Sequence, residues 1–141
     1  MFFFALAFFV VSLYYKNWLW LLPGTIVHES LHYIVGWFTS AGPTNFSVRP
    51  QDGVYGEVWF TDLNQLNALP VAIAPLLGVP LALMLVYMTN PKDLALVVIY
   101  AWIAGTTVAQ AWPSRQDWSL VREYWIGSLF WISGIIWLTF W

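Results

Sequence analysis

Five apolar runs take up most of the chain, and they constrain its fold more than any other feature. Hydrophobic residues make up 60% of the chain and charged residues only 9%, whereas a soluble domain carries about 25% charged residues. A transmembrane helix needs about 20 apolar residues. The sequence therefore predicts an all-α, multi-pass integral membrane protein of the cell membrane, with one domain (residues 1–141) and about five transmembrane helices. The runs are Met1–Tyr15, Trp18–Phe38, Leu69–Met88, Leu94–Trp112 and Tyr124–Trp141.

The remaining composition excludes several other classes of protein. The first run lacks a basic segment and a cleavage signature, which favours a retained span over a signal peptide. The formal net charge of −2 provides no basic surface, so we expect the lipid bilayer and no nucleic acid as a partner. The chain has no cysteine, which excludes disulfides and any thiolate zinc site.

The second run contains the pattern H-E-x-x-H, formed by His28, Glu29 and His32. Residues four apart lie on one face of a helix, so both imidazoles can reach one metal ion while Glu29 projects beside it and holds a water. The alternative is a pair of core histidines that hydrogen-bond to neighbouring backbone. Ionisable groups within a membrane span are costly and usually functional, which favours the metal site.

A catalytic zinc ion takes three protein ligands and a water, so a third ligand is needed. The chain has two histidines and no cysteine, which leaves a carboxylate. Asp117 is the favoured ligand, because the helix break at Pro113 can turn the following segment back toward the membrane interior. Glu123 is the alternative ligand. Asp117 would otherwise be an interfacial carboxylate paired with Arg115 or Arg122.

A polar stretch after the second run has the pattern of a β-hairpin. Asp-Gly at 52–53 lies between the β-prone runs 45–51 and 54–60, which is a strong hairpin signal. One interpretation is an ordinary loop. The other is a membrane-associated hairpin with an open edge, on which an extended peptide could add as a strand. Glu57 and Val58 are then candidates for substrate contact.

Proline and small residues predict where helices bend or approach each other. Pro23-Gly24 should kink the H-E-x-x-H helix or begin its inner segment. Gly105-Thr106-Thr107 should let two helices pack closely, and Asn90–Asp93 should form a tight turn. The third run should be bent or partly unwound, with protein or water satisfying the freed carbonyls, because its first half holds three prolines: Pro70, Pro75 and Pro80.

Two segments together resemble a small, compact branch of the site-2 protease clan of intramembrane zinc proteases: Pro23–His32 and Pro113–Asp117. The resemblance covers about Leu22 to Trp118 and implies a three-helix catalytic core, about residues 18–118. It implies an intramembrane zinc metalloprotease that hydrolyses peptide bonds of transmembrane or membrane-proximal protein substrates.

The resemblance also assigns roles to individual residues. It implies that His28, His32 and Asp117 bind one catalytic zinc ion and that Glu29 is the general base. Gln110-Ala-Trp-Pro keeps the clan's N-x-x-P spacing with Gln for Asn, so Gln110 or a hairpin N–H is the candidate oxyanion donor. The clan's L-D-G is absent around the aspartate, which lies between Gln and Trp.

Two other functions remain as alternatives. A catalytically inactive metal-binding membrane protein, such as a pseudoprotease, scaffold or sensor, is favoured by the missing L-D-G pattern. It is disfavoured by the retention of Glu29, which metal binding alone does not need. A small structural or channel-like protein would carry polar residues on several spans, yet the first, third and fifth runs are nearly free of them.

Overall fold

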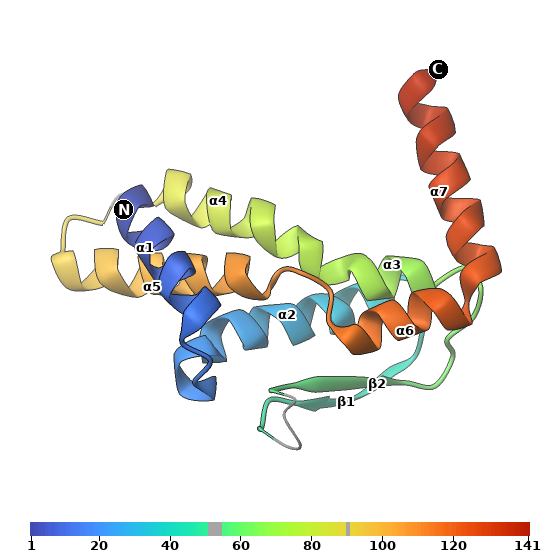
Figure 1. Cartoon of the computed structure of the whole chain (residues 1–141), viewed down its shortest axis with the longest axis horizontal. Coiled ribbons are helices and arrows are strands. Elements are labelled where there is room, and N and C mark those ends of the chain that lie inside the picture. Colours follow the sequence, from blue (N-terminus) through green and yellow to red (C-terminus); the bar gives the residue numbers. More distant parts are fainter. Residues whose placement is uncertain (51–54, 90) are drawn as a thin grey trace.

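A computed structural model describes residues 1–50, 55–89 and 91–141, and this part of the chain is mostly helical with one short hairpin (Figure 1). The elements in chain order are α1 (Phe2–Tyr14), α2 (Trp18–Phe38), β1 (Pro43–Ser47), β2 (Glu57–Phe60), α3 (Ala68–Ile73), the 3₁₀ turn η1 (Ala74–Leu77), α4 (Gly78–Met88), α5 (Leu94–Gln110), α6 (Arg115–Glu123) and α7 (Trp125–Phe140).

The described residues hold one to three candidate membrane spans rather than five separate ones. Ala68–Met88 is long and apolar enough by itself, with a mean hydropathy of 2.3. α1 with α2, and α5 with α6, qualify only as bent pairs, with bends of 108° and 41°. Some apolar runs, the first among them, form helices that are shorter than the run itself. The 13 residues of α1 reach only about 20 Å at 1.5 Å per residue, less than a bilayer core of about 30 Å.

The chain turns sharply between α1 and α2, before the H-E-x-x-H motif. Asn17 caps α2, its side chain accepting from main-chain N–H groups of the first turn. The indole Nε1 of Trp20 donates to Ser12 Oγ at 3.0 Å, which ties the two helices together at the bend. α2 itself passes through Pro23 without a break. Because Pro23 lies near the helix start, its missing N–H removes only one early helical bond.

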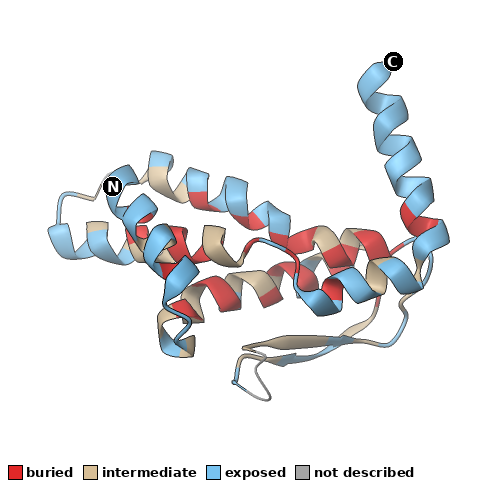
Figure 2. Ribbon diagram, viewed as in Figure 1, coloured by how far each residue is buried: buried red, intermediate tan, exposed pale blue. Residues whose placement is uncertain are grey.

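Small residues bring α1, α2 and α5 into close contact, as the sequence predicted for 105–107. A Cβ at Gly24 of α2 would fall on the main-chain carbonyl of Thr106 in α5. A Cβ at Gly105 would lie 2.6 Å from the carbonyl oxygen of Ala5 in α1. Thr106 and Thr107 are buried. Buried residues accordingly concentrate where these helices and α3 pass each other (Figure 2).

The proline-rich third run bends as expected. The α-helical hydrogen-bonding pattern of α3 gives way to the 3₁₀ turn η1, which has Pro75 near its start, and resumes as α4. A proline lacks the N–H that an α-helix needs at each position, so the helix tightens there. The bend places α3 beside α2 and α6, while α4 extends along α5 (Figure 1).

The hairpin is present, which excludes an ordinary loop. β1 and β2 are antiparallel, with Phe46 opposite Val58. β1 begins two residues before the predicted run 45–51, and the Asp-Gly turn at 52–53 lies outside the described residues. Gly56 and Phe60 face α2, because a Cβ at Gly56 would meet Glu29 and a Cβ at Gly36 of α2 would meet Phe60.

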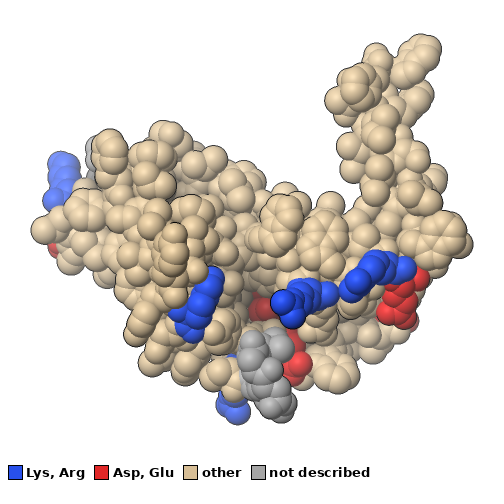
Figure 3. Space-filling model, viewed as in Figure 1, with Lys and Arg blue, Asp and Glu red and all other residues tan. Residues whose placement is uncertain are grey.

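α6 and α7 complete the fold. The polar segment after Pro113 forms α6. The sequence did not predict a helix there. On the face that Figure 3 shows, charged side chains gather around α6 and the hairpin, with a few more near the turn between α4 and α5. Asn90 of that predicted turn lies outside the described residues, and Asp93 caps α5. α7 projects away from the other helices (Figure 1) and is exposed over nearly its whole length.

Candidate metal centre

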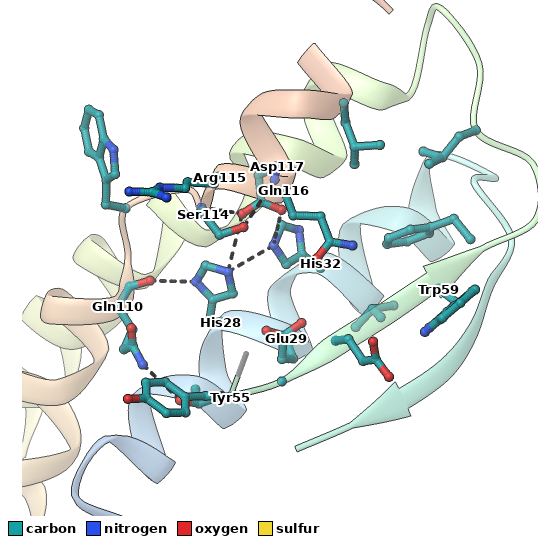
Figure 4. Close-up of a pocket in the computed structure, with 18 residues that line it drawn as sticks. His28, Glu29, His32, Tyr55, Trp59, Gln110, Ser114, Arg115, Gln116 and Asp117 are labelled. Atoms are coloured by element: carbon teal, nitrogen blue, oxygen red, sulfur yellow. Dashed lines mark hydrogen bonds and ion pairs between the residues drawn. The ribbon is translucent and has the colours of Figure 1, made fainter. Parts of the chain in front are cut away.

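Side chains of His28, His32 and Asp117 converge where α2 meets α6 (Figure 4). The two imidazole Nε2 atoms are 3.2 Å apart. Asp117 Oδ1 lies 3.1 Å from His32 Nε2, and Oδ2 lies 3.6 Å from His28 Nε2. All three side chains are nearly buried. The spacing along α2 and the return of the chain after Pro113 therefore bring the three predicted ligands together.

Main-chain carbonyls orient both imidazoles. His28 Nδ1 donates to the carbonyl of Gln110 at 2.6 Å, and His32 Nδ1 donates to the carbonyl of Val71 at 2.8 Å. A carbonyl oxygen can only accept, so each Nδ1 carries a proton, and the neutral form of each ring then presents its lone pair at Nε2. Ligand histidines in metalloproteins are held in the same way, through the ring nitrogen that does not bind the metal.

Ser114 holds the aspartate through a capping box at the start of α6. Its main-chain N–H donates to Asp117 Oδ2 at 2.6 Å, and its hydroxyl accepts from the main-chain N–H of Asp117 at 3.2 Å. Ser114 is not among the site residues predicted from the sequence. The pattern S-x-x-D directly after Pro113 is the local signal that would have found it.

The chemistry of this group suits a cation. With each Nδ1 protonated, two Nε2 lone pairs and a carboxylate face one another, and a cation among them removes their mutual repulsion. Donor atoms at about 2.0–2.2 Å from a tetrahedral zinc ion are separated by about 3.3–3.6 Å, close to the distances observed. The structure thus contains a buried group of three ligands that can hold a metal ion.

The alternative third ligand and the alternative partners of Asp117 lie outside this group. Glu123 is exposed at the end of α6 and does not belong to the ligand group. Within residues 1–50, 55–89 and 91–141, the basic side chains at ion-pair distance from Asp117 are the two histidines. The alternative pairing with Arg115 or Arg122 is not observed there.

Glu29 lies beside the ligand group without joining it. It follows His28 on α2 and is 7% exposed, and Figure 4 shows it on the side of the histidines that faces β2. A Cβ at Gly56 would come within 2.6 Å of Glu29 Cγ, so only glycine lets the strand pass so close. In the described part of the chain, no hydrogen bond from protein engages the Glu29 carboxylate, which is therefore free to bind a water.

A cavity of about 720 Å³ opens over this centre. α2 supplies one wall, β2 with Tyr55 and Gly56 another, and the end of α5 with the start of α6 a third. The predicted substrate residues Glu57 and Val58 both line it. The cavity is large enough to take several residues of an extended chain.

Gln110 also lines the cavity, and both its side-chain amide and its main-chain carbonyl form hydrogen bonds. Its side-chain Nε2 donates to Thr25 Oγ1 at 3.0 Å, and its carbonyl accepts from His28. An amide nitrogen has two hydrogens, and in the described part of the chain one of them has a protein partner, which leaves the other N–H for a ligand. Thr25 in turn donates to the carbonyl of Leu21, which fixes the position of the amide.

Comparison of the chain with protein-family models, with curated proteins and with solved structures finds no match in any of the three.

Proposed function

We propose that this chain is a zinc metalloprotease of the membrane, with Glu29 as its general base. One observation carries the proposal: a three-ligand metal centre and an unengaged carboxylate face the same 720 Å³ cavity. Three protein ligands are typical of catalytic zinc sites, whereas structural sites use four. Two imidazoles and one carboxylate suit zinc better than magnesium or calcium, which prefer oxygen ligands alone.

The chemistry proposed is hydrolysis of a peptide bond. A zinc ion held by His28, His32 and Asp117 supplies Lewis-acid chemistry, which polarises a carbonyl and makes water nucleophilic near neutral pH. The Glu29 carboxylate accepts a proton from the attacking water as the C–O bond forms. It then delivers that proton to the amide nitrogen as the C–N bond breaks, so that the products are a carboxylic acid and an amine.

The negative charge that develops on the carbonyl oxygen needs a hydrogen-bond donor. The remaining N–H of Gln110 and the main-chain N–H groups of the hairpin are the candidates, since both border the cavity. A donor in this role contributes about 3 kcal/mol to transition-state stabilisation. The hydrogen bond from Gln110 to Thr25 holds the amide in one orientation, which favours such a role.

The hairpin supports a protein substrate. A transmembrane helix has its backbone hydrogen bonds closed and must unwind before cleavage. In the described chain the sheet has two strands, so β2 pairs with β1 on one edge only. Its other edge can offer main-chain bonds to an unwound segment. Tyr55 and every residue of β2 border the cavity, which would place such a segment over the metal centre.

The position of the centre supports proteolysis within the bilayer. His28 lies ten residues after Trp18, the start of α2, which corresponds to about 15 Å along the helix. Water must then reach this depth. The bent third run and the polar start of α6 are the proposed walls of its path, and the Val71 carbonyl freed in that bend is satisfied within the protein.

The alternative of an inactive metal-binding protein is tested with one substitution. Glu29→Gln removes the base but keeps the volume of the side chain, and it leaves all three metal ligands intact. We expect purified Glu29→Gln to retain zinc and to cleave quenched-fluorescent casein in detergent about 10²–10⁴-fold more slowly than wild type. Casein is unfolded, so cleavage does not depend on unwinding a helix.

The control is Glu123→Gln, which changes an exposed glutamate of α6 in the same way and should cleave like wild type. A panel of synthetic transmembrane peptides, analysed by mass spectrometry, extends the assay to helical substrates. Zinc-loaded wild-type protein that cleaves neither casein nor the peptides would favour the inactive metal-binding protein. Equal cleavage by wild type and Glu29→Gln would refute the assignment of the base.

A further inference from the structure

Each histidine of the metal centre donates to a carbonyl whose helical hydrogen bonding is altered by a nearby proline. An α-helical carbonyl accepts the N–H four residues later, or three residues later in a 3₁₀ turn. Pro75 stands four residues after Val71, and Pro113 stands three residues after Gln110. A proline has no N–H. The carbonyls of Val71 and Gln110 are those that accept His32 Nδ1 and His28 Nδ1.

Pro75 affects which donors share the carbonyl oxygen of Val71. The carbonyl accepts the main-chain N–H of Ala74 in a 3₁₀ bond, and its second lone pair accepts His32. A residue with an N–H at position 75 would offer the α-helical bond to the same oxygen. Val71 itself is fully buried, so water does not compete for this oxygen. Because position 75 has no N–H, the second lone pair of this carbonyl stays available to His32.

At Gln110 the proline frees two groups that the metal centre uses. α5 ends at Gln110, and in the described chain His28 is the partner of its carbonyl. The next available donor is the N–H of Ser114, but that N–H donates to Asp117 Oδ2 instead. The break at Pro113 thus provides a carbonyl for one ligand and an N–H for another.

We propose that Pro75 and Pro113 are positioning residues of the metal centre, which hold His32 and His28 in the Nδ1–H form with Nε2 directed at the ion. The inference rests on the metal site of the proposed function, and it does not depend on proteolysis. Loss of a hydrogen bond that orients a metal ligand typically weakens metal binding 10–100-fold. We therefore expect about this loss of zinc affinity when either proline is replaced by alanine.

A matched control lies on the same segment. Pro80 also removes a helical N–H, from the bond to the carbonyl of Leu76, but it is exposed. In the described chain the carbonyl of Leu76 accepts the main-chain N–H of Gly78 and no imidazole. Pro80→Ala therefore changes the proline content of the third run without touching a histidine partner, and we expect zinc affinity within about twofold of wild type.

The experiment uses the full-length protein in detergent and two measurements. The first is zinc affinity, determined by competition with a chromophoric chelator. The second is NMR of protein labelled with ¹⁵N-histidine, recorded with and without zinc. The chain has only two histidines, so every imidazole signal comes from the metal centre. The chemical shift of each Nδ1 proton, and its exchange rate with water, report its hydrogen bond to a carbonyl.

The expected pattern separates positioning from a general effect on folding. Pro75→Ala should weaken the Nδ1 hydrogen bond of His32 and leave that of His28, and Pro113→Ala should do the reverse. Each should bind zinc 10–100-fold more weakly than wild type. The inference is overturned if both variants keep wild-type Nδ1 signals, whatever their zinc affinity, or if Pro80→Ala loses as much affinity as they do.

The two prolines test the inference separately, because each acts through a different histidine. If one variant fails to fold, the other still decides the outcome. Wild-type protein that binds no zinc would refute the proposed metal centre and function. The Nδ1 signals of the zinc-free protein would then still show whether the prolines set the imidazole hydrogen bonds.

Discussion

Helices α2 and α7 have similar compositions and opposite surroundings. Both are apolar, rich in tryptophan and free of lysine and arginine. α2 buries residues along its whole length, including Gly24, Thr25, Glu29 and His32, whereas α7 buries only Gly127 and Ser128 in its first turn. The difference in burial comes from a few small and polar residues, which the average hydrophobicity of a helix does not reveal. Small residues let α2 approach α5, and each polar residue buried in α2 faces a partner or the cavity.

This contrast divides the chain into two parts in which substitutions should have different effects. Substitutions around α2 should affect folding, metal binding and cleavage together, because the same close contacts hold the ligands. Substitutions on the distal part of α7 meet open space, and a Cβ at Gly134 has nothing within 4 Å. An exposed apolar surface of this kind suits lipid, whose hydrocarbon core imposes no specific packing.

The largest effect is expected at Gly24. Gly24→Val places a branched side chain against the main-chain carbonyl of Thr106, which cannot move without separating α2 from α5. We expect a loss of about 3 kcal/mol or more in the free energy of unfolding, measured by thermal denaturation in detergent, together with loss of zinc binding. The matched change Gly134→Val in α7 should alter stability by less than about 0.5 kcal/mol. Equal effects at the two positions would remove the contrast between the helices.

An intermediate effect is expected at Val58, which tests whether the functional region extends to the hairpin. Val58→Pro removes one N–H from β2. If β2 receives the substrate, casein cleavage should fall about five- to tenfold, since one main-chain hydrogen bond is worth about 1–1.4 kcal/mol. Zinc content should stay at the wild-type value, because Val58 is not a ligand. Unchanged cleavage would show that the hairpin is only a wall of the cavity.

The smallest effect is expected at Trp131, where α7 joins the rest of the protein. Its indole Nε1 donates to the carbonyl of Leu66 at 2.6 Å. Trp131→Phe keeps an aromatic ring but loses this bond, so the free energy of unfolding should fall by about 1 kcal/mol. Zinc affinity and cleavage should not change. A loss of zinc affinity in this variant would show that α7 is coupled to the metal centre.

Local sequence signals predicted much of the structure. The predicted run Trp18–Phe38 has the bounds of α2, because the apolar pattern and the H-E-x-x-H spacing both depend only on nearby residues. The proline spacing predicted the interruption that became η1, and the Asp-Gly signal predicted the hairpin. Asp117 could be chosen over Glu123 as the third ligand because Pro113 breaks the helix locally and can turn the following segment back toward the membrane interior.

Tertiary arrangements could not be predicted in the same way. The carbonyl that accepts His32 belongs to Val71, 39 residues away in the chain, and no local pattern links the two. The 108° bend before α2 depends on how α1 packs against α5. The sequence predicts more spans than the described residues hold, because an apolar run reveals neither a sharp bend nor a helix as short as the 16 residues of α7.

Metal analysis of the purified protein tests the central claim most directly. Wild type and Glu123→Ala should each bind about one zinc ion per chain. His28→Ala and Asp117→Ala should each lose affinity by a few hundred-fold, since structural zinc sites share about 10–16 kcal/mol of binding among four protein ligands. Retention of full zinc occupancy by Asp117→Ala at low zinc concentration would contradict the metal centre described for this fold.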